Sequence, residues 1–194
     1  MKLRLMAVNL IFNGNDLLLM KRAPERLLHP GMWGAVGGHM EPEELSDPLA
    51  ACLRETEEET GFRPDDLTDV RLQYVLLRLK EDELRQQFFF TSTTNRRDYT
   101  DTREGTLHWI PREEVLREDR EMAFVFRALL AHYFEFGPAP HPWVGTAGWS
   151  EPKEGQEPLE GQRPLEAQGP LEAQGVDQTL PGIRWIPLLD PQVI

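Results

Sequence analysis

The chain has 194 residues, which suggests one domain with additional segments, and 40% of them are apolar, which is sufficient for a hydrophobic core. Its 21 basic and 33 acidic residues give a net charge of −12, which argues against a nucleic-acid polymer as partner, because such binding requires neutralisation of phosphates. A single cysteine permits no internal disulfide, and no apolar run approaches the roughly 18 residues of a membrane span. We therefore expect a cytoplasmic globular protein with no membrane partner.

The first part of the chain has the residue pattern of strands. Residues 3–12 and 17–22 are two predicted strands joined by the turn Asn13–Asp16, and residues 32–36 form a short third strand. The N-terminal apolar run is interrupted by Asn9 and is followed by no small-residue cleavage site. It is therefore interpreted as a strand and not as a signal peptide.

A helix is predicted directly after an acidic loop. The loop contains Gly37, Gly38, Glu41, Glu43 and Glu44. Asp47 is a suitable N-cap and Pro48 a suitable first helical residue, because proline needs no N–H partner there. The helix should run to Thr60 and end at Gly61 in a left-handed conformation.

The second half of the domain repeats the alternation of strands and a helix. Residues 70–80, 86–94 and 106–110 are predicted strands, and residues 119–136 form a second amphipathic helix that ends at Gly137. The resulting order, β-β-β-α-β-β-β-α, predicts an α/β fold with a mixed sheet that carries helices on both faces.

The C-terminal end of the first helix is unusually acidic. Glu55 lies three and four residues before Glu58 and Glu59, so like charges share one face at the negative end of the helix dipole. Each such pair costs about 0.2–0.5 kcal/mol. A bound cation would relieve the repulsion, and carboxylates without cysteine or histidine form an oxygen site suited to Mg²⁺ or Mn²⁺. Arg54 could orient one carboxylate. The alternative is a solvated acidic face, which the dipole and the spacing both oppose.

This stretch resembles the signature of the Nudix hydrolases, G-x5-E-x7-R-E-U-x-E-E-x-G-U, in which U is a bulky apolar residue. The matching residues are Gly38, Glu44, Arg54, Glu55, Glu58, Glu59, Gly61 and Phe62. Two features depart from the pattern. Nine residues instead of seven separate Glu44 from Arg54, which leaves Glu43 or Glu41 as alternatives for the role of Glu44, and Thr56 replaces the bulky apolar residue.

The resemblance implies an α/β/α sandwich over about residues 1–136 and Mg²⁺-dependent hydrolysis of a diphosphate linked to another group. It implies Glu58 and Glu59 as the main metal ligands and Glu55 as a further ligand or general base. The carbonyl of Gly37 would be another ligand, and Arg54 would orient the cluster. A further glutamate from a later loop is also typical of the family; Glu104 is the candidate, with an exposed loop acid as the alternative.

Candidate cations for the substrate phosphates are Arg22 and Arg78, with Lys21 and Arg85 also available, and His39 could contact a phosphate or be an exposed loop histidine. The chain lacks the downstream markers of several Nudix subfamilies. It most resembles nucleoside-triphosphate pyrophosphatases, including those acting on 8-oxo-dGTP, with an ADP-ribose or nucleotide-sugar pyrophosphatase as the alternative enzyme. A non-catalytic nucleotide-sensing module of the same fold is the alternative from another class.

Residues 137–194 differ from the rest of the chain. Ten of the 16 prolines lie there, and the hexapeptides GQEPLE, GQRPLE and AQGPLE follow one another in residues 155–172. Single leucines between prolines cannot fill a core, so we expect a flexible linker. Residues 183–187 regain apolar character and are expected either to dock on this domain or a partner's, or to remain unattached; a homodimer stays open.

Overall fold

The computed structural model describes residues 1–25, 30–80, 82–100, 102, 104–150 and 180–188. Its centre is a mixed sheet in the order β3-β2-β1-β6-β5-β8-β9, with β4 paired to β1 and β7 paired to β2. The strands are β1 Lys2–Asn13, β2 Asp16–Arg22, β3 Trp33–Gly34, β4 Val36–His39, β5 Thr68–Lys80, β6 Glu83–Thr93, β7 Gly105–Pro111, β8 Trp143–Ser150 and β9 Leu180–Pro187. β1 runs parallel to β6 and antiparallel to β2 and β4.

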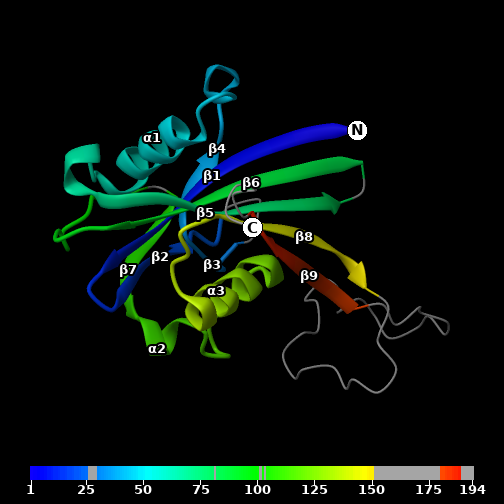
Figure 1. Ribbon diagram of the computed structural model, residues 1–194. Coiled ribbons are helices and arrows are strands. Elements are labelled where there is room, and N and C mark those ends of the chain that lie inside the picture. The colour runs from blue at the N-terminus through cyan, green and yellow to red at the C-terminus, as the bar shows by residue number, and fades with distance from the viewer. Residues whose placement is uncertain (26–29, 81, 101, 103, 151–179, 189–194) are drawn as a thin grey trace.

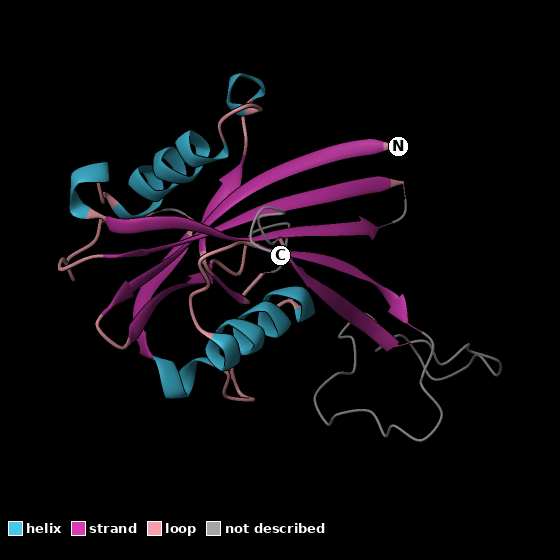
Figure 2. Cartoon of the chain, viewed as in Figure 1, coloured by secondary structure: helices cyan, strands magenta, loops and turns pink. Residues whose placement is uncertain are grey.

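Helices cover both faces of this sheet. Helix α1, Pro48–Thr60, lies on one face, and α2, Arg112–Val115, and α3, Phe124–Phe136, lie on the other (Figures 1 and 2). Separate apolar clusters pack between the sheet and each helical layer. The predicted α/β/α arrangement is therefore confirmed. Among the described residues, no helix has the length and apolarity required to cross a membrane.

Helix α1 begins and ends where its sequence predicts. The side chain of Asp47 accepts a hydrogen bond of 3.1 Å from the backbone N–H of Ala50, and Pro48 is the first helical residue. Gly61 has a φ of 74° and donates its N–H to the carbonyl of Glu57 at 2.8 Å. Both ends are thus fixed by local chemistry, which holds the acidic last turns in place.

Three local features differ from the prediction. The helix expected from residue 119 begins only at Phe124, because the buried Met122 forms a β-bridge with Trp33 and keeps this segment extended. The short helix α2 was not predicted. Gly37 and Gly38 belong to strand β4, where they pair with Val8 and Ala7, and so precede the acidic loop.

The described part of residues 137–194 joins the same sheet. β8 pairs with β5 in parallel, and β9 pairs with β8 antiparallel. The ring of Trp185 lies 5.1 Å from that of the buried Tyr74 and 5.0 Å from that of His132. Residues 183–187 thus lie in β9, with the Trp185 ring against Tyr74 and His132 of the same chain. The hexapeptide repeats lie outside the described residues, and their flexibility stays a prediction.

Candidate active site at the end of helix α1

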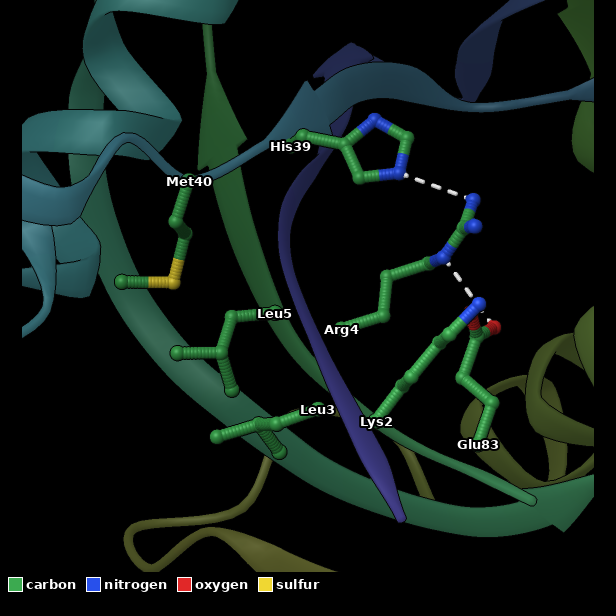
Figure 3. A pocket seen from close by; sticks show the side chains of 7 residues that line it. All are labelled: Lys2, Leu3, Arg4, Leu5, His39, Met40 and Glu83. Carbon is green, nitrogen blue, oxygen red and sulfur yellow. Dashed lines mark hydrogen bonds and ion pairs between the residues drawn. The ribbon is translucent and has the colours of Figure 1, made fainter.

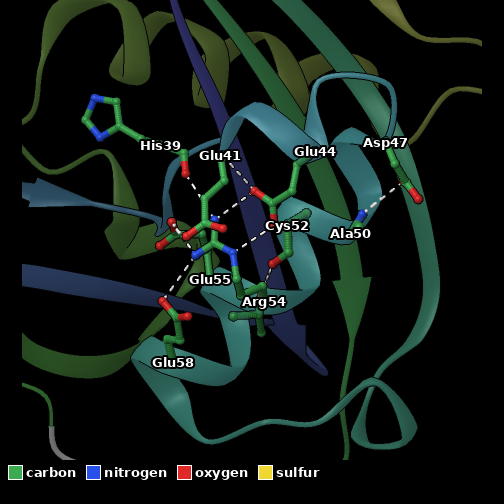
Figure 4. A network of polar contacts seen from close by, with 10 residues as sticks. His39, Glu41, Glu44, Asp47, Ala50, Cys52, Arg54, Glu55 and Glu58 are labelled. Carbon is green, nitrogen blue, oxygen red and sulfur yellow. Dashed lines mark hydrogen bonds and ion pairs between the residues drawn. The ribbon is translucent and has the colours of Figure 1, made fainter.

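Arg54 is the centre of the polar contacts on α1 (Figure 4). Its Nε and Nη2 donate to the two carboxylate oxygens of Glu44 at 2.8 and 2.9 Å. Its Nη1 donates to Glu55 at 2.9 Å and to Glu58 at 3.2 Å, and Nη2 also reaches the carbonyl of His39 at 3.1 Å. One guanidinium thus joins three carboxylates and the end of β4. The hydrogen bonds with Glu44 are the main reason that the pKa of Arg54 is raised.

The geometry identifies Glu44 as the acid that pairs with Arg54. The bidentate contact fixes its carboxylate, which also accepts the backbone N–H of Glu41 at 2.8 Å. The hydrogen bond from Arg54 is the main reason that the pKa of Glu44 is lowered. The two extra residues are absorbed between the single 3₁₀ turn Pro42–Glu44 and the start of α1, where Leu45 is exposed.

Glu59 is the buried member of the acidic cluster. Its side chain is only 7% exposed and accepts the backbone N–H of Gly37 at 2.8 Å. Burial raises its pKa to about 8, and the nearby charges of Glu104 and Glu55 add to the rise, while the Gly37 hydrogen bond and Arg22 oppose it. A carboxylate in this position requires positive charge in order to ionise at neutral pH.

The glycine pair of β4 lets the helix and the sheet approach closely. A Cβ on Gly38 would lie 2.4 Å from a carboxylate oxygen of Glu55, and a Cβ on Gly37, whose φ is 140°, would lie 2.3 Å from the carbonyl oxygen of Ala7. Burial raises the pKa of Glu55, and Arg54 opposes the rise. Gly37 is therefore required by the backbone, whereas Gly38 leaves space for a carboxylate.

Glu104, just before β7, and Arg22, the last residue of β2, lie near the same acidic region. Glu104 is half-buried, and its charge raises the pKa of both Glu55 and Glu59. Gly105, the next residue, pairs with Arg22, and the backbone N–H of Ala23 donates to the carbonyl of Glu104 at 2.9 Å. A hollow of about 680 Å³ beside these residues is lined by Arg22, Thr102 and Gly105, among others.

The other two predicted substrate-binding residues, His39 and Arg78, lie on β4 and β5. The imidazole of the exposed His39 is 3.2 Å from Nη1 of Arg4, and burial together with Arg4 lowers its pKa. Arg78, on β5, stands next to Arg85 of β6 and does not contact the carboxylates of α1. Sequence analysis did not single out Arg4; its only signal was a basic residue within an apolar strand.

A family model for the NUDIX domain matches residues 2–133, which is more than half of the chain. The chain belongs to the Nudix family. A probable nudix hydrolase of Schizosaccharomyces pombe is 31% identical to it over 137 residues, which are 69% of this chain and 48% of that relative. The chain thus spans about half the length of this curated relative.

Solved structures show the same Nudix fold. A MutT protein from Bacillus halodurans has a TM-score of 0.61 at 22% identity, over 76% of this chain and 90% of that one. An Ap4A hydrolase of C. elegans, in a binary complex, has a TM-score of 0.55 at 21% identity, over 69% and 96% of the two chains. The NUDIX domain of Shewanella oneidensis NrtR, solved with ADP ribose, has a TM-score of 0.55 at 18% identity, over 70% and 88%.

The residues of this Nudix site fit a divalent cation in donor chemistry and in charge. All acidic groups gathered at the end of α1 are carboxylates, which suit Mg²⁺ or Mn²⁺. In the described part of the chain, no set of three or more acidic, histidine or cysteine side chains is arranged to hold an ion. Arg54 donates hydrogen bonds to oxygens of Glu55 and Glu58. The Glu58 side chain is 59% exposed and has room to adopt another rotamer. The predicted convergence of Glu55, Glu58 and Glu59 stays a prediction.

The structure also explains why this Nudix box tolerates Thr56. Thr56 is fully buried, donates its hydroxyl to the carbonyl of Cys52 at 2.7 Å and accepts the side-chain N–H of Asn9 at 3.2 Å. Asn9 in turn accepts the hydroxyl of Ser92 at 2.9 Å. A polar chain from β6 through β1 to α1 thus replaces the apolar contact of the family pattern and satisfies each buried group.

Proposed function

We propose that this protein is a Mg²⁺-dependent Nudix pyrophosphohydrolase, for which Mn²⁺ can substitute. It cleaves a nucleoside diphosphate linked to another group and releases a nucleoside monophosphate. The observation that carries this proposal is the buried Glu59, whose carboxylate is placed against Gly37 among further acids and has a pKa raised to about 8. Such an arrangement favours an added cation and is typical of functional sites.

Each residue of the site has a role in this proposal. Glu58, Glu59 and the carbonyl of Gly37 would hold the metal, with Glu55 as a further ligand. When bound, the metal would neutralise phosphate charge and acidify a water molecule. Glu55 is also suited to accept a proton, because burial raises its pKa toward neutrality, and Glu104 is the second candidate. Arg54 would position these carboxylates, and Arg22 and His39 would contact the phosphates.

For the substrate, we infer a nucleoside triphosphate, including oxidised forms such as 8-oxo-dGTP. Similarity in fold to structures named as MutT and as an Ap4A hydrolase supports a polyphosphate substrate. The NrtR domain that binds ADP ribose supports the alternative, an ADP-ribose or nucleotide-sugar pyrophosphatase. A small-molecule substrate agrees with the net charge of −12, and a cytoplasmic location is part of the proposal.

The test is Mg²⁺-dependent turnover of a panel of nucleoside triphosphates, 8-oxo-dGTP, ADP-ribose and a nucleotide sugar. Glu58→Gln should lower kcat/KM by more than about 100-fold, because it removes a metal ligand, and should leave thermal stability unchanged or raised. Glu57→Gln is the matched control, since Glu57 lies on the same turn and is similarly exposed but pairs with Arg63 instead of Arg54. Wild-type turnover by Glu58→Gln at saturating Mg²⁺ would contradict the assignment. Nucleotide binding without turnover by the wild-type protein would instead indicate a sensor.

A further inference from the structure

Three arginines lie directly opposite one another on three neighbouring strands. Arg4 of β1 pairs with Arg85 of β6, and Arg85 pairs with Arg78 of β5. Residues opposite one another in a ladder project to the same face of a sheet, and like charges in this position are destabilising. We call these three residues the arginine row.

The arginine row is only partly neutralised. Glu83 accepts a hydrogen bond from Nε of Arg85 at 2.5 Å and lies 3.0 Å from Nε of Arg4, using the same oxygen for both. Arg78 forms no hydrogen bond or ion pair with any other residue that the structure describes. Its neighbour on the other side is the small Ala147 of β8, and Arg78 is half-buried.

The arginine row faces away from α1, and at one end its Arg4 is linked to the carboxylate site through His39. Side chains an even number of residues apart on a strand point to the same face of the sheet. Arg4, Arg78 and Arg85 are separated in this way from three residues of the core under α3, so the row lies on the face that α3 covers. These core residues are Val8, Leu76 and Phe89, in that order. His39 connects the two sites, because its carbonyl accepts Arg54 while its imidazole is 3.2 Å from Arg4 (Figure 3). A hollow of about 550 Å³ is lined there by Arg4, His39 and Glu83, among others.

Building on the pyrophosphohydrolase activity proposed above, we propose that the arginine row binds the terminal phosphates of the substrate. The substrate is then a nucleoside polyphosphate and not a nucleotide whose diphosphate ends in a neutral sugar. Guanidinium groups form charge-assisted, bidentate hydrogen bonds with phosphate, and three adjacent ones match a chain of phosphates. Arg78 is the residue that gains most from such a ligand, because it has no hydrogen bond or ion pair with the described residues to give up.

Inorganic tripolyphosphate is a direct probe of this site, because its binding can be measured by calorimetry without turnover. In the Glu58→Gln background, tripolyphosphate should still bind, and adding Arg78→Gln should weaken it by about tenfold or more, the size of a lost charge-assisted hydrogen bond. Arg71→Gln is the matched control, because Arg71 is an exposed arginine of the same strand. Arg78→Gln should also raise the melting temperature without ligand, since it removes a like-charge contact with Arg85.

Kinetics separate this inference from the proposed function. Arg78→Gln should raise KM for nucleoside triphosphates about tenfold and leave KM for ADP-ribose unchanged. Arg78→Lys should recover part of the lost affinity for nucleoside triphosphates. Equal tripolyphosphate affinity in Arg78→Gln and Arg71→Gln would overturn the inference, even if every nucleotide is hydrolysed. Absence of turnover on the whole panel would overturn the proposed function, while a selective loss of tripolyphosphate binding would still support the anion site. Arg85→Gln provides a second variant if Arg78→Gln does not fold.

Discussion

Two regions of the molecule gather side chains of like charge, and each contains one side chain of the opposite sign. At the end of α1, Arg54 contacts the carboxylates of Glu44, Glu55 and Glu58. Across β1, β6 and β5, Glu83 contacts Arg4 and Arg85, whereas it forms no ion pair with Arg78. A planar guanidinium has five N–H donors, so Arg54 can donate hydrogen bonds to three carboxylates. Glu83 uses a single oxygen for both of its arginines and therefore contacts fewer partners.

The difference shows which charge each region still requires. In the acidic region Glu59 is buried outside the contacts of Arg54, and among the described residues the backbone N–H of Gly37 and the charge of Arg22 favour its ionised form. In the basic region the corresponding residue is Arg78. A cation beside Glu59 and an anion beside Arg78 would complete the two clusters, and a metal-bound polyphosphate supplies both charges. The net charge of −12 is a sum over the whole chain and does not reveal these two clusters of opposite charge.

The largest effect should come from removing the shared arginine. Arg54→Met leaves Glu44, Glu55 and Glu58 without their common partner, so they repel one another and lose their orientation. Because the Arg54 side chain is 25% exposed, we expect the free energy of unfolding to fall by about 1–3 kcal/mol, between the values for surface and buried pairs. Activity should fall about 10–100-fold, as for residues that orient metal ligands. Urea unfolding and steady-state kinetics measure the two effects.

Arg54→Lys refines this comparison, because lysine keeps the charge but cannot make the bidentate contact with Glu44. It should recover part of the stability and little of the activity. Arg63→Met is the control: Arg63 is 78% exposed and 3.7 Å from Glu57, outside the cluster. If Arg54→Met were as stable and active as Arg63→Met, the carboxylates would not depend on their shared partner.

The second effect is the pH dependence caused by Glu59. Its pKa is about 8 in the folded protein and 4.5 ordinarily, so between these values the folded state binds a proton that the unfolded state has lost. The free energy of unfolding of metal-free protein should therefore fall as pH rises through this range, by on the order of a few kcal/mol. Glu59→Gln should remove that slope. Unfolding in EDTA at about pH 5 and about pH 8.5 measures it.

Metal provides the decisive control for Glu59. At the higher pH, Mg²⁺ should stabilise the wild-type protein and should not stabilise Glu59→Gln, because only the ionised carboxylate gains from the cation. Glu57→Gln should behave as wild type in both media, since Glu57 is exposed. A wild-type slope retained in Glu59→Gln would show that another group titrates over this range.

The parts of the structure that could be predicted from the sequence are those fixed by neighbouring residues. Asp47, Pro48 and Gly61 set the ends of α1 through contacts within one turn, and their prediction was confirmed. The acidic face of α1 follows from helical periodicity alone. The alternation of strands and helices likewise predicted the layers of the fold, because it requires only the polarity pattern of each segment.

The parts that could not be predicted depend on register and on contacts across the chain. Asn9 was noticed only as an interruption of an apolar run, and its role appears once β1 lies beneath Thr56, 47 residues away. The arginine row requires the pairing of three strands, which a shift of one residue would abolish. The choice of Glu44 over its neighbours depends on the turn that brings it to Arg54.

The smallest effect should come from neutralising the shared acid of the arginine row. Glu83→Gln removes a competitor for Arg4 and Arg85, so tripolyphosphate should bind more tightly, by up to about fivefold, the size of a weak ion pair that is partly exposed. The gain should shrink as ionic strength rises, because the distance over which charges act in water falls to about 10 Å at 0.1 M salt and becomes shorter at higher salt. Asp119→Asn is the control, since it removes one carboxylate from an exposed ion pair with Arg117 on another part of the surface. Weaker binding in Glu83→Gln would show that Glu83 holds the two arginines in position. Glu83 would then have the same role for the arginines that Arg54 has for the carboxylates.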